Sequence, residues 1–228
     1  NGKAGLHHGS RRVSDNPGES GWHAELDQDD LTEDRVPADP MALFATWYEQ
    51  ALAADLFDPT AMTLATADPL GKPSARTVLL KGFDEQGFRF YTNYDSRKGR
   101  EINANPHAAL VFWWDRLERQ VRIEGEIAPL PPADSDSYFA SRPRGSRIGA
   151  HASPQSRVIA DRQTLERAYE QTEQQFGGDR AVPRPAHWGG YNLSPRAIEF
   201  WQGRRNRLHD RLVYRRSDER WRLQRLAP

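Results

Sequence analysis

The stretch HAALVFWWDRLERQVRIEGEI, residues 107–127, holds the clearest structural signal in the chain. In its second part, apolar residues such as Val121 and Ile123 alternate with charged or amide side chains, as in a half-buried strand. A short Asp-Arg-Leu link separates this part from an apolar first part. The stretch therefore predicts a hairpin of two antiparallel strands, residues 107–114 and 118–127, with one face in a core.

Periodicity elsewhere predicts a fold built mainly of strands. Helices are expected at 40–54, 96–104, 132–141 and 157–176, and further strands at 61–67, 74–83, 88–92, 188–201, 207–216 and 220–226. The 74–83 and 88–92 segments are expected to form a second hairpin, and the 188–201 strand is expected to bend at Ser194-Pro195. Many antiparallel strands with a few flanking helices favour a closed or partly closed barrel. A G-x-G-x-x-G turn is absent, so this sequence predicts no Rossmann-type nucleotide site.

The composition excludes several classes of function. The chain has 228 residues, 32 basic and 32 acidic, and no cysteine, which rules out disulfides and cysteine metal sites. No apolar run approaches the ~18 residues of a membrane span, and no export signal is visible. We therefore expect a cytoplasmic protein that binds neither membranes nor, given its weak charge balance, nucleic acid.

The charge is unevenly distributed along the chain. Residues 14–40 hold nine acidic residues and one basic residue, whereas residues 41–228 hold 28 basic and 23 acidic residues. Residues 1–38 are also poor in periodic apolar positions, which is typical of an unfolded or loosely docked segment. We expect a flexible acidic arm over residues 1–38 and a single folded domain over residues 39–228.

Basic residues gather at three places, which indicates bound anions such as phosphate-bearing small molecules. The first is Arg97-Lys98, directly after a helix N-cap at Asp95 or Ser96. Cations are unfavourable there, because the helix dipole already makes that end positive. An anion bound at the helix start would remove the conflict; a solvated basic patch is the alternative.

The second place is the Ser/Gly-rich loop expected after residue 141, with Arg142, Arg144 and Arg147. Tyr138, Ser146 and an arginine fork could hold a phosphate monoester. The third place runs from Arg204 to Arg211. If this segment is a strand, Arg207, His209 and Arg211 line one face, and these groups repel one another unless something negative or electron-rich lies there.

Five polar residues are weaker candidates. Arg76 and Lys81 stand five apart in one expected strand and would point to opposite faces, either toward different ligands or into solvent. Gln120 could present its amide to a heterocycle or to water. Gln155-Ser156 stands at the expected N-cap of the 157–176 helix. The histidines lack metal-ligand spacing with carboxylates, so no metal site is expected.

In this order along the chain, the motifs resemble those of the pyridoxamine 5'-phosphate oxidases, flavoproteins that make pyridoxal 5'-phosphate. The matching motifs are RTVLLK (76–81), FYTN (90–93), SRKGREI (96–102), LERQVRIEG (117–125), YFASRPRGSRIGA (138–150), QS (155–156), WGGY (188–191), EFWQG (199–203), RLHDR (207–211) and RLAP (225–228). The resemblance extends from about residue 37 to the last residue. No arm residue is carried over to the site, because the acidic segment 23–27 stands where a basic segment is frequent in the family.

The resemblance implies an FMN-binding split β-barrel that forms a homodimer with FMN at the subunit interface. The family's FMN contacts fall here on Arg76, Val78, Lys81, Tyr91, Thr92, Arg97, Lys98, Gln120, Gln155, Ser156, Trp201 and Arg211. Its substrate contacts fall on Lys81, Tyr138, Arg142, Ser146, Arg207 and His209. Arg207 and His209 are the expected catalytic residues, which would position the reacting carbon and help to steer protons.

The implied activity is FMN-dependent oxidation of pyridoxamine 5'-phosphate and pyridoxine 5'-phosphate by O2. The products would be pyridoxal 5'-phosphate and H2O2, with NH3 from the amine. Two alternatives remain: a related oxidase of phenazine biosynthesis, and a split-barrel flavin- or haem-binding protein without oxidase turnover. The phosphate-binding set around Arg142 argues against the first, and peroxide production would exclude the second.

Overall fold

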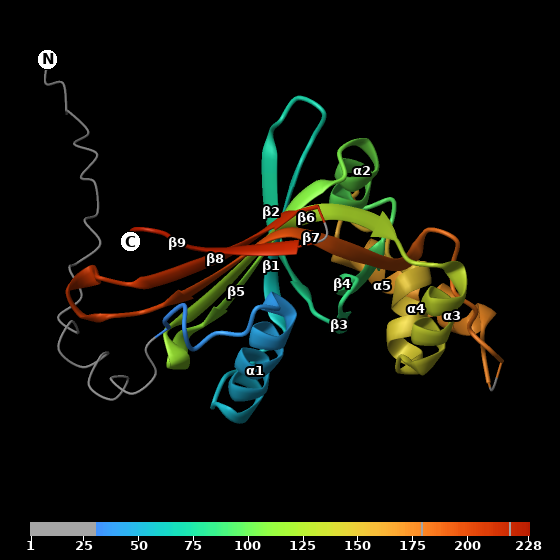
Figure 1. Ribbon diagram of the computed structural model, residues 1–228. Helices are drawn as coiled ribbons and strands as arrows, with labels where there is room; N and C mark the ends of the chain where they lie inside the picture. Colours follow the sequence, from blue (N-terminus) through green and yellow to red (C-terminus); the bar gives the residue numbers. More distant parts are fainter. Residues whose placement is uncertain (1–30, 179, 219) are drawn as a thin grey trace, which may run out of the picture.

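The computed structural model describes residues 31–178, 180–218 and 220–228 (Figure 1). In these residues nine strands form one antiparallel sheet: β1 Ala61–Ala67, β2 Pro73–Leu79, β3 Gly82–Asp84, β4 Gly87–Asn93, β5 His107–Trp114, β6 Arg119–Pro129, β7 Trp188–Gln202, β8 Asp210–Ser217 and β9 Arg220–Arg225. The helices are α1 Pro40–Ala53, α2 Arg97–Ala104, α3 Pro132–Ser141, α4 Arg144–Ala152 and α5 Arg162–Gln175, with short 3-10 turns η1 Asp115–Leu117 and η2 Arg205–Arg207. The expected mainly β fold with flanking helices is confirmed.

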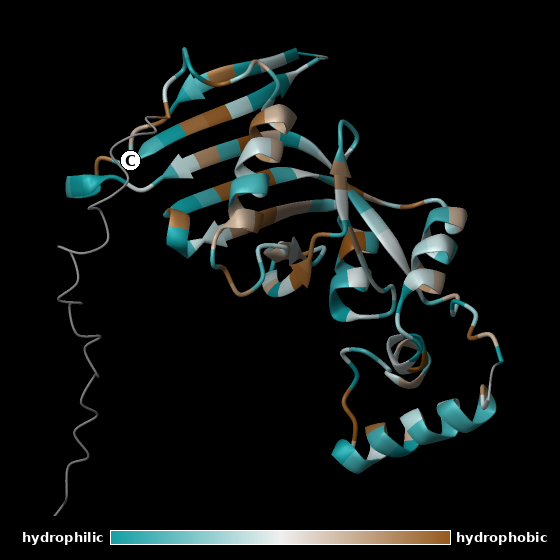
Figure 2. Cartoon of the chain, turned by 90° about the horizontal axis from the view of Figure 1, so that it is seen from below, coloured by the Kyte–Doolittle hydropathy of each residue, from teal (hydrophilic) through white to brown (hydrophobic). Residues whose placement is uncertain are grey.

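The sheet curls into a half-barrel because β7 pairs with three strands. The order is β2-β1-β5-β6-β7-β4-β3, and β8 and β9 continue from the far half of β7. Residues 188–193 of β7 pair with β4, and residues 197–202 pair with β8. Between these halves the β6–β7 register shifts, next to the predicted bend at Ser194-Pro195. The strands carry alternating hydrophilic and hydrophobic residues (Figure 2), as the sequence pattern predicts.

Helix α1 closes the core of the half-barrel. It begins as predicted at Asp39-Pro40, where the Asp39 carboxylate accepts a hydrogen bond from the Met41 N–H at 3.0 Å. Phe44 is fully buried, and its ring lies 4.8 Å from the rings of both Phe83 and Phe88. Burial of these aromatic rings against one another contributes strongly to the stability of the core.

A second apolar cluster lies beside the sheet, where α3, α4 and α5 gather at the Trp188 end of β7 (Figure 1). Phe139 of α3, Ile148 of α4 and Trp188 are buried together. The expected strands β8 and β9 lie on the other side of the molecule. No helix in the described part of the chain is long and apolar enough to cross a membrane.

The first thirty residues of the expected arm lie outside the described residues, and residues 31–38 contact the C-terminal strands. Leu31 is buried, and the Arg225 guanidinium contacts both its carbonyl oxygen, at 2.7 Å, and the Glu33 carboxylate, at 2.9 Å. The Tyr214 hydroxyl donates to the Pro37 carbonyl at 2.7 Å. The end of the segment is thus attached to β8 and β9.

The expected strand over 74–83 is wrong, because the chain changes partner in its middle. Strand β2 ends at Leu79 after pairing with β1, and β3 then pairs with β4. At the corner, the Leu80 N–H donates to Thr60 and the Lys81 N–H donates to Arg89, each at 2.9 Å. The expected hairpin therefore survives only as the short β3–β4 pair. Lys81 lies outside β2, so the prediction that Arg76 and Lys81 point to opposite faces of one strand is wrong.

Three other expectations near the helices and the C-terminus are wrong. Residues 144–152 form helix α4 and not a loop, and α5 begins at Arg162 after the N-cap Asp161 and not at residue 157. Strand β8 begins at Asp210, so residues 207–209 precede it. Packing of Ile148 against the second apolar cluster explains a helix in a Gly/Ser-rich sequence of low helix propensity.

Phe44→Ala should lower the free energy of unfolding by about 3–5 kcal/mol, because it leaves a cavity among aromatic rings. Urea denaturation at fixed protein concentration measures the change. Phe57→Ala is the matched control, since the Phe57 side chain is fully exposed. Equal losses in the two variants would contradict the assignment of the core.

Candidate functional site

The start of helix α2 is held tightly against the preceding loop. The Ser96 hydroxyl caps the helix by accepting from the Gly99 N–H at 3.3 Å, as one of the two predicted caps. A Cβ on Gly99 would lie 2.0 Å from the Tyr94 carbonyl oxygen, so only glycine permits this approach. Arg97 and Lys98 therefore stand in the first helical turn at a fixed position.

A buried carboxylate, Glu101, joins α2 to the first two strands. Its Oε2 accepts from the hydroxyls of Thr66 and Ser74, each at 2.5 Å, and from Arg76 at 3.2 Å. Its Oε1 accepts from Arg97 Nε at 2.8 Å. Burial alone would raise the pKa of Glu101, but these four donors outweigh it and lower the pKa to about 2.

Lys98 points to the other side of the same helix start. Its ammonium group donates to the Thr92 hydroxyl at 3.2 Å and to the Gln155 amide oxygen at 2.9 Å. Burial lowers the pKa of Lys98, and the nearby positive charge of Arg76 lowers it further. A bound anion would relieve this repulsion. We call Arg76, Thr92, Arg97, Lys98 and Gln155, together with Glu101, the α2 cluster.

Three aromatic rings and one arginine form an aromatic cluster beside α3. The rings of Tyr91 and Tyr138 stack at 3.8 Å, and Trp188 lies parallel to both. The Arg142 guanidinium lies 4.5 Å from the centre of the Trp188 ring. Burial lowers the pKa of Arg142, and its buried Nη1 has no hydrogen-bond partner among the described residues. An oxygen acceptor at this nitrogen would satisfy it.

A third group lies on the outer face of the sheet and is called the outer-sheet row. Trp113, Gln120, Trp201 and Arg211 occupy the same register on β5, β6, β7 and β8. The two indole rings lie 5.9 Å apart. Arg211 is held by the Glu199 carboxylate at 2.8 Å, which raises its pKa. The row thus presents an amide between two flat rings, next to a fixed cation.

The two expected catalytic residues lie in the loop before β8. Arg207 is exposed with a positive φ of 58° in η2, so the expected single strand face with His209 and Arg211 is wrong. His209 packs at 4.5 Å against the Trp201 ring, and its Nδ1 accepts from the Arg204 N–H at 3.0 Å. This hydrogen bond leaves the proton of a neutral His209 on Nε2. His209 thus adjoins the outer-sheet row.

The remaining predicted residues are dispersed. Val78 packs against the core from β2, and Lys81 is exposed at the corner that follows. Ser146 is exposed on α4. Ser156 is exposed with a φ of 67° and lies five residues before the true N-cap of α5, so its expected capping role is wrong.

The aromatic cluster and the outer-sheet row lie at opposite ends of one strand. Trp188 begins β7 and Trp201 lies thirteen residues further along it. At the usual rise of a strand the two residues are roughly 40 Å apart along the chain. Tyr91 of the aromatic cluster and Thr92 of the α2 cluster are consecutive residues of β4, so the two clusters begin at the same place on that strand, on its two faces. Within one chain the predicted residues thus fall into two groups at opposite ends of β7.

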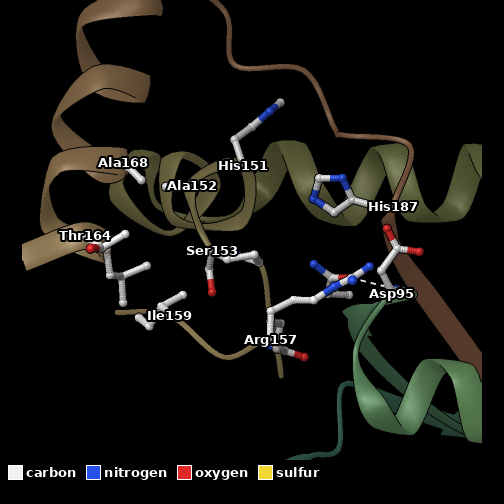
Figure 3. Close-up of a pocket in the computed structure, with 13 residues that line it drawn as sticks. Asp95, His151, Ala152, Ser153, Arg157, Ile159, Thr164, Ala168 and His187 are labelled. Atoms are coloured by element: carbon white, nitrogen blue, oxygen red, sulfur yellow. Dashed lines mark hydrogen bonds between the residues drawn. The ribbon is translucent and has the colours of Figure 1, made fainter. Parts of the chain in front are cut away.

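A cavity of about 340 Å³ borders the α2 cluster between α4, α5 and the loop before β7 (Figure 3). Gln155 lines it, together with Asp95, His151, Arg157 and His187. None of the predicted substrate contacts is among its lining residues. Gln155 is thus shared between this cavity and the cationic helix start.

Sequence reasoning missed four residues that organise these groups: Glu101, Trp113, Trp188 and Glu199. Trp188 and Glu199 stand in the quoted motifs WGGY and EFWQG, and Glu101 stands in SRKGREI, but none of them was predicted to have a role. A signal was present for Glu101, since its spacing of four from Arg97 places both on one helix face.

The half-barrel, with its groups of cations and aromatic rings, resembles a flavin oxidase. Comparison with known proteins agrees with this resemblance. Residues 48–176 match the family model described as Pyridoxamine 5'-phosphate oxidase. Residues 188–228 match the Pyridoxine 5'-phosphate oxidase C-terminal dimerisation region. The chain belongs to the pyridoxamine 5'-phosphate oxidase family.

Individual relatives match over most of their length. The pyridoxine/pyridoxamine 5'-phosphate oxidase of Cyanothece sp. is 57% identical over 88% of this chain and 94% of its own. The protein of the same name from Rubrobacter xylanophilus is 56% identical over 92% and 96%. Among solved structures, PhzG from Burkholderia lata, in complex with tetrahydrophenazine-1-carboxylic acid, has a TM-score of 0.82 at 32% identity, covering 88% of this chain and 98% of its own.

The buried Glu101 predicts a specific loss of stability in acid. Its folded pKa of about 2 lies below its ordinary value of 4.5, so its ionised form stabilises the fold above about pH 4.5 and this contribution is lost as the pH falls toward 2. Glu101→Gln should therefore be less stable than the parent at about pH 6, and the difference should shrink at about pH 3. Urea midpoints at the two pH values measure it. A difference that stays constant would contradict the lowered pKa.

Proposed function

We propose that the chain is an FMN-dependent oxidase of pyridoxamine 5'-phosphate and pyridoxine 5'-phosphate. The relatives named for these two substrates support the reaction, since they match over nearly the whole chain. One structural observation carries the phosphate-bearing substrate: the buried Nη1 of Arg142 lacks an acceptor among the described residues. A substrate phosphate oxygen supplies that acceptor, and Lys81, Tyr138 and Ser146 complete the proposed phosphate site.

The residues present also fit FMN. The α2 cluster offers three cations, Arg76, Arg97 and Lys98, to the cofactor phosphate. The outer-sheet row offers the Gln120 amide between two indoles, which suits a flat heterocycle with donors and acceptors. Val78, Tyr91, Thr92, Gln155, Ser156, Trp201 and Arg211 are the further proposed contacts.

FMN held by these residues would supply the redox chemistry, which is hydride acceptance from the C4' carbon of the substrate and transfer of both electrons to O2 to give H2O2. The chain binds and orients the substrate, so that most of its contribution comes from positioning. Arg207 stays charged and acts by orientation, not as a base. A neutral His209 carries its proton on Nε2 and donates a hydrogen bond from that nitrogen. Water hydrolyses the imine formed from the amine substrate, which releases NH3.

The site is completed across a homodimer. The matched dimerisation region supports the dimer. The separation of the two residue groups along β7 supports a site in which the α2 and aromatic clusters of one protomer face the outer-sheet row and the 204–209 loop of its partner. FMN then lies at the interface. The cytoplasmic location stays a prediction from the sequence.

The phenazine alternative draws support from the fold of PhzG, but that protein is 32% identical to this chain, against 57% for the oxidase of Cyanothece. Turnover of pyridoxine 5'-phosphate, with none of unphosphorylated pyridoxine, would favour the proposed function. Peroxide release during that turnover would exclude a binding protein without activity. Equal turnover of the two vitamers would contradict the phosphate site around Arg142.

Arg207→Ala should lower kcat/KM for pyridoxine 5'-phosphate by about 100-fold, because the substrate loses its orientation. The absorbance spectrum of bound flavin should persist, since no FMN contact is assigned to Arg207. Arg220→Ala, which removes an exposed arginine from β9, is the control and should leave turnover intact. Unchanged turnover of Arg207→Ala would remove this residue from the site.

Mixing two variants of low activity tests the shared site. In a dimer of Arg142→Ala with Arg207→Ala, one site carries both changes and the other carries neither. Random exchange makes half of the dimers mixed, so about a quarter of the parental activity should return. Peroxide assays after refolding the two variants together measure it. Failure to recover activity would contradict a site built from two protomers.

A further inference from the structure

A buried carboxylate lies beside the cations to which the proposed function assigns the cofactor phosphate. Glu101 has 7% of its side chain exposed and lies within the α2 cluster, beside Arg76 and Arg97. By Coulomb's law alone a negative charge there weakens the binding of an anion. Its presence therefore needs a physical reason.

The contacts of Glu101 supply one. Its two oxygens hold guanidinium groups from two different elements, Arg76 from β2 and Arg97 from α2. The hydroxyls of Thr66 and Ser74 also donate to Oε2 of Glu101 and are themselves within hydrogen-bond distance of Arg76. The carboxylate thus fixes the direction of one arginine from each element. Arg97 remains 59% exposed, so its free N–H groups stay accessible to a ligand.

The charges of the cluster also match a phosphate monoester. Arg76, Arg97 and Lys98 supply three positive charges and Glu101 removes one, which leaves two. A phosphate monoester carries about −1.5 to −2 charges near neutral pH. Without Glu101 the cluster would hold three mutually repelling cations. Burial is the main cause of the lowered pKa of Lys98, and the positive charge of Arg76 lowers this pKa further.

We propose that Glu101 is a positioning residue for the cofactor phosphate, which orders Arg76 and Arg97 before the phosphate arrives. The inference rests on the proposed binding of FMN and goes beyond it, because Glu101 itself does not touch the cofactor. Ordered arginines bind a phosphate with little loss of side-chain freedom. Ordering the two arginines therefore strengthens binding of the phosphate group only, and not of the flavin ring.

Riboflavin, which lacks the phosphate, separates this role from a merely structural one. The measurement is the ratio of the two dissociation constants, riboflavin over FMN, from quenching of flavin fluorescence by the apoprotein. In Glu101→Gln the ratio should fall about tenfold, because the charged hydrogen bonds that align the arginines are weakened. Loss of a purely repulsive charge predicts the opposite sign, a ratio that rises. A general structural defect weakens both flavins equally and leaves the ratio unchanged.

Glu166→Gln is the matched control. Glu166 pairs with Arg162 at the same spacing of four on α5, at 2.6 Å, but is 51% exposed and outside the cluster. Its ratio should equal that of the parent. If Glu101→Gln does not fold, Ser74→Ala removes one donor to the same carboxylate and should lower the ratio in the same direction by a smaller factor.

The outcomes distinguish this inference from the proposed function. A parent protein that binds neither flavin contradicts the proposed function itself. A parent that prefers FMN, with variants at Glu101 and Ser74 that keep the full preference or increase it, contradicts only the positioning role.

Discussion

The structure depends on the pairing of one long strand, β7, with different partners at its two ends. Residues 188–193 pair with β4, and residues 197–202 pair with β8. The first half brings Trp188 to the aromatic cluster, and the second half carries Trp201 in the outer-sheet row. The two groups thus lie at opposite ends of one strand, and the proposed site combines one group from each of two protomers.

Each half of the site is held by charges and rings that are already paired or stacked within the chain. Glu101 orders Arg76, and Glu199 orders Arg211, so in both halves a carboxylate fixes an arginine next to the expected cofactor position. Lys98 and Arg142 are different, because burial lowers the pKa of each. These two cations gain most from an incoming anion, and they belong to the two proposed phosphate sites.

The sequence predicted the features that are governed by local rules. Alternation gave the β5–β6 hairpin, and the Asp39 and Ser96 caps gave two helix starts. It could not give the corner at Leu80, where Thr60 accepts the backbone hydrogen bond from the far side of a hairpin. Nor could it give helix α4, which depends on tertiary packing, or the left-handed backbone of Arg207. Motif resemblance named the candidate contacts, but the supporting carboxylates emerged only from the three-dimensional arrangement.

A crystal structure of the FMN-loaded protein tests the central claim most directly. We expect the cofactor phosphate beside Arg76 and Lys98 of one protomer and the flavin ring beside Gln120 and Trp201 of its partner. A cofactor whose contacts all come from a single protomer would contradict the division of the site along β7.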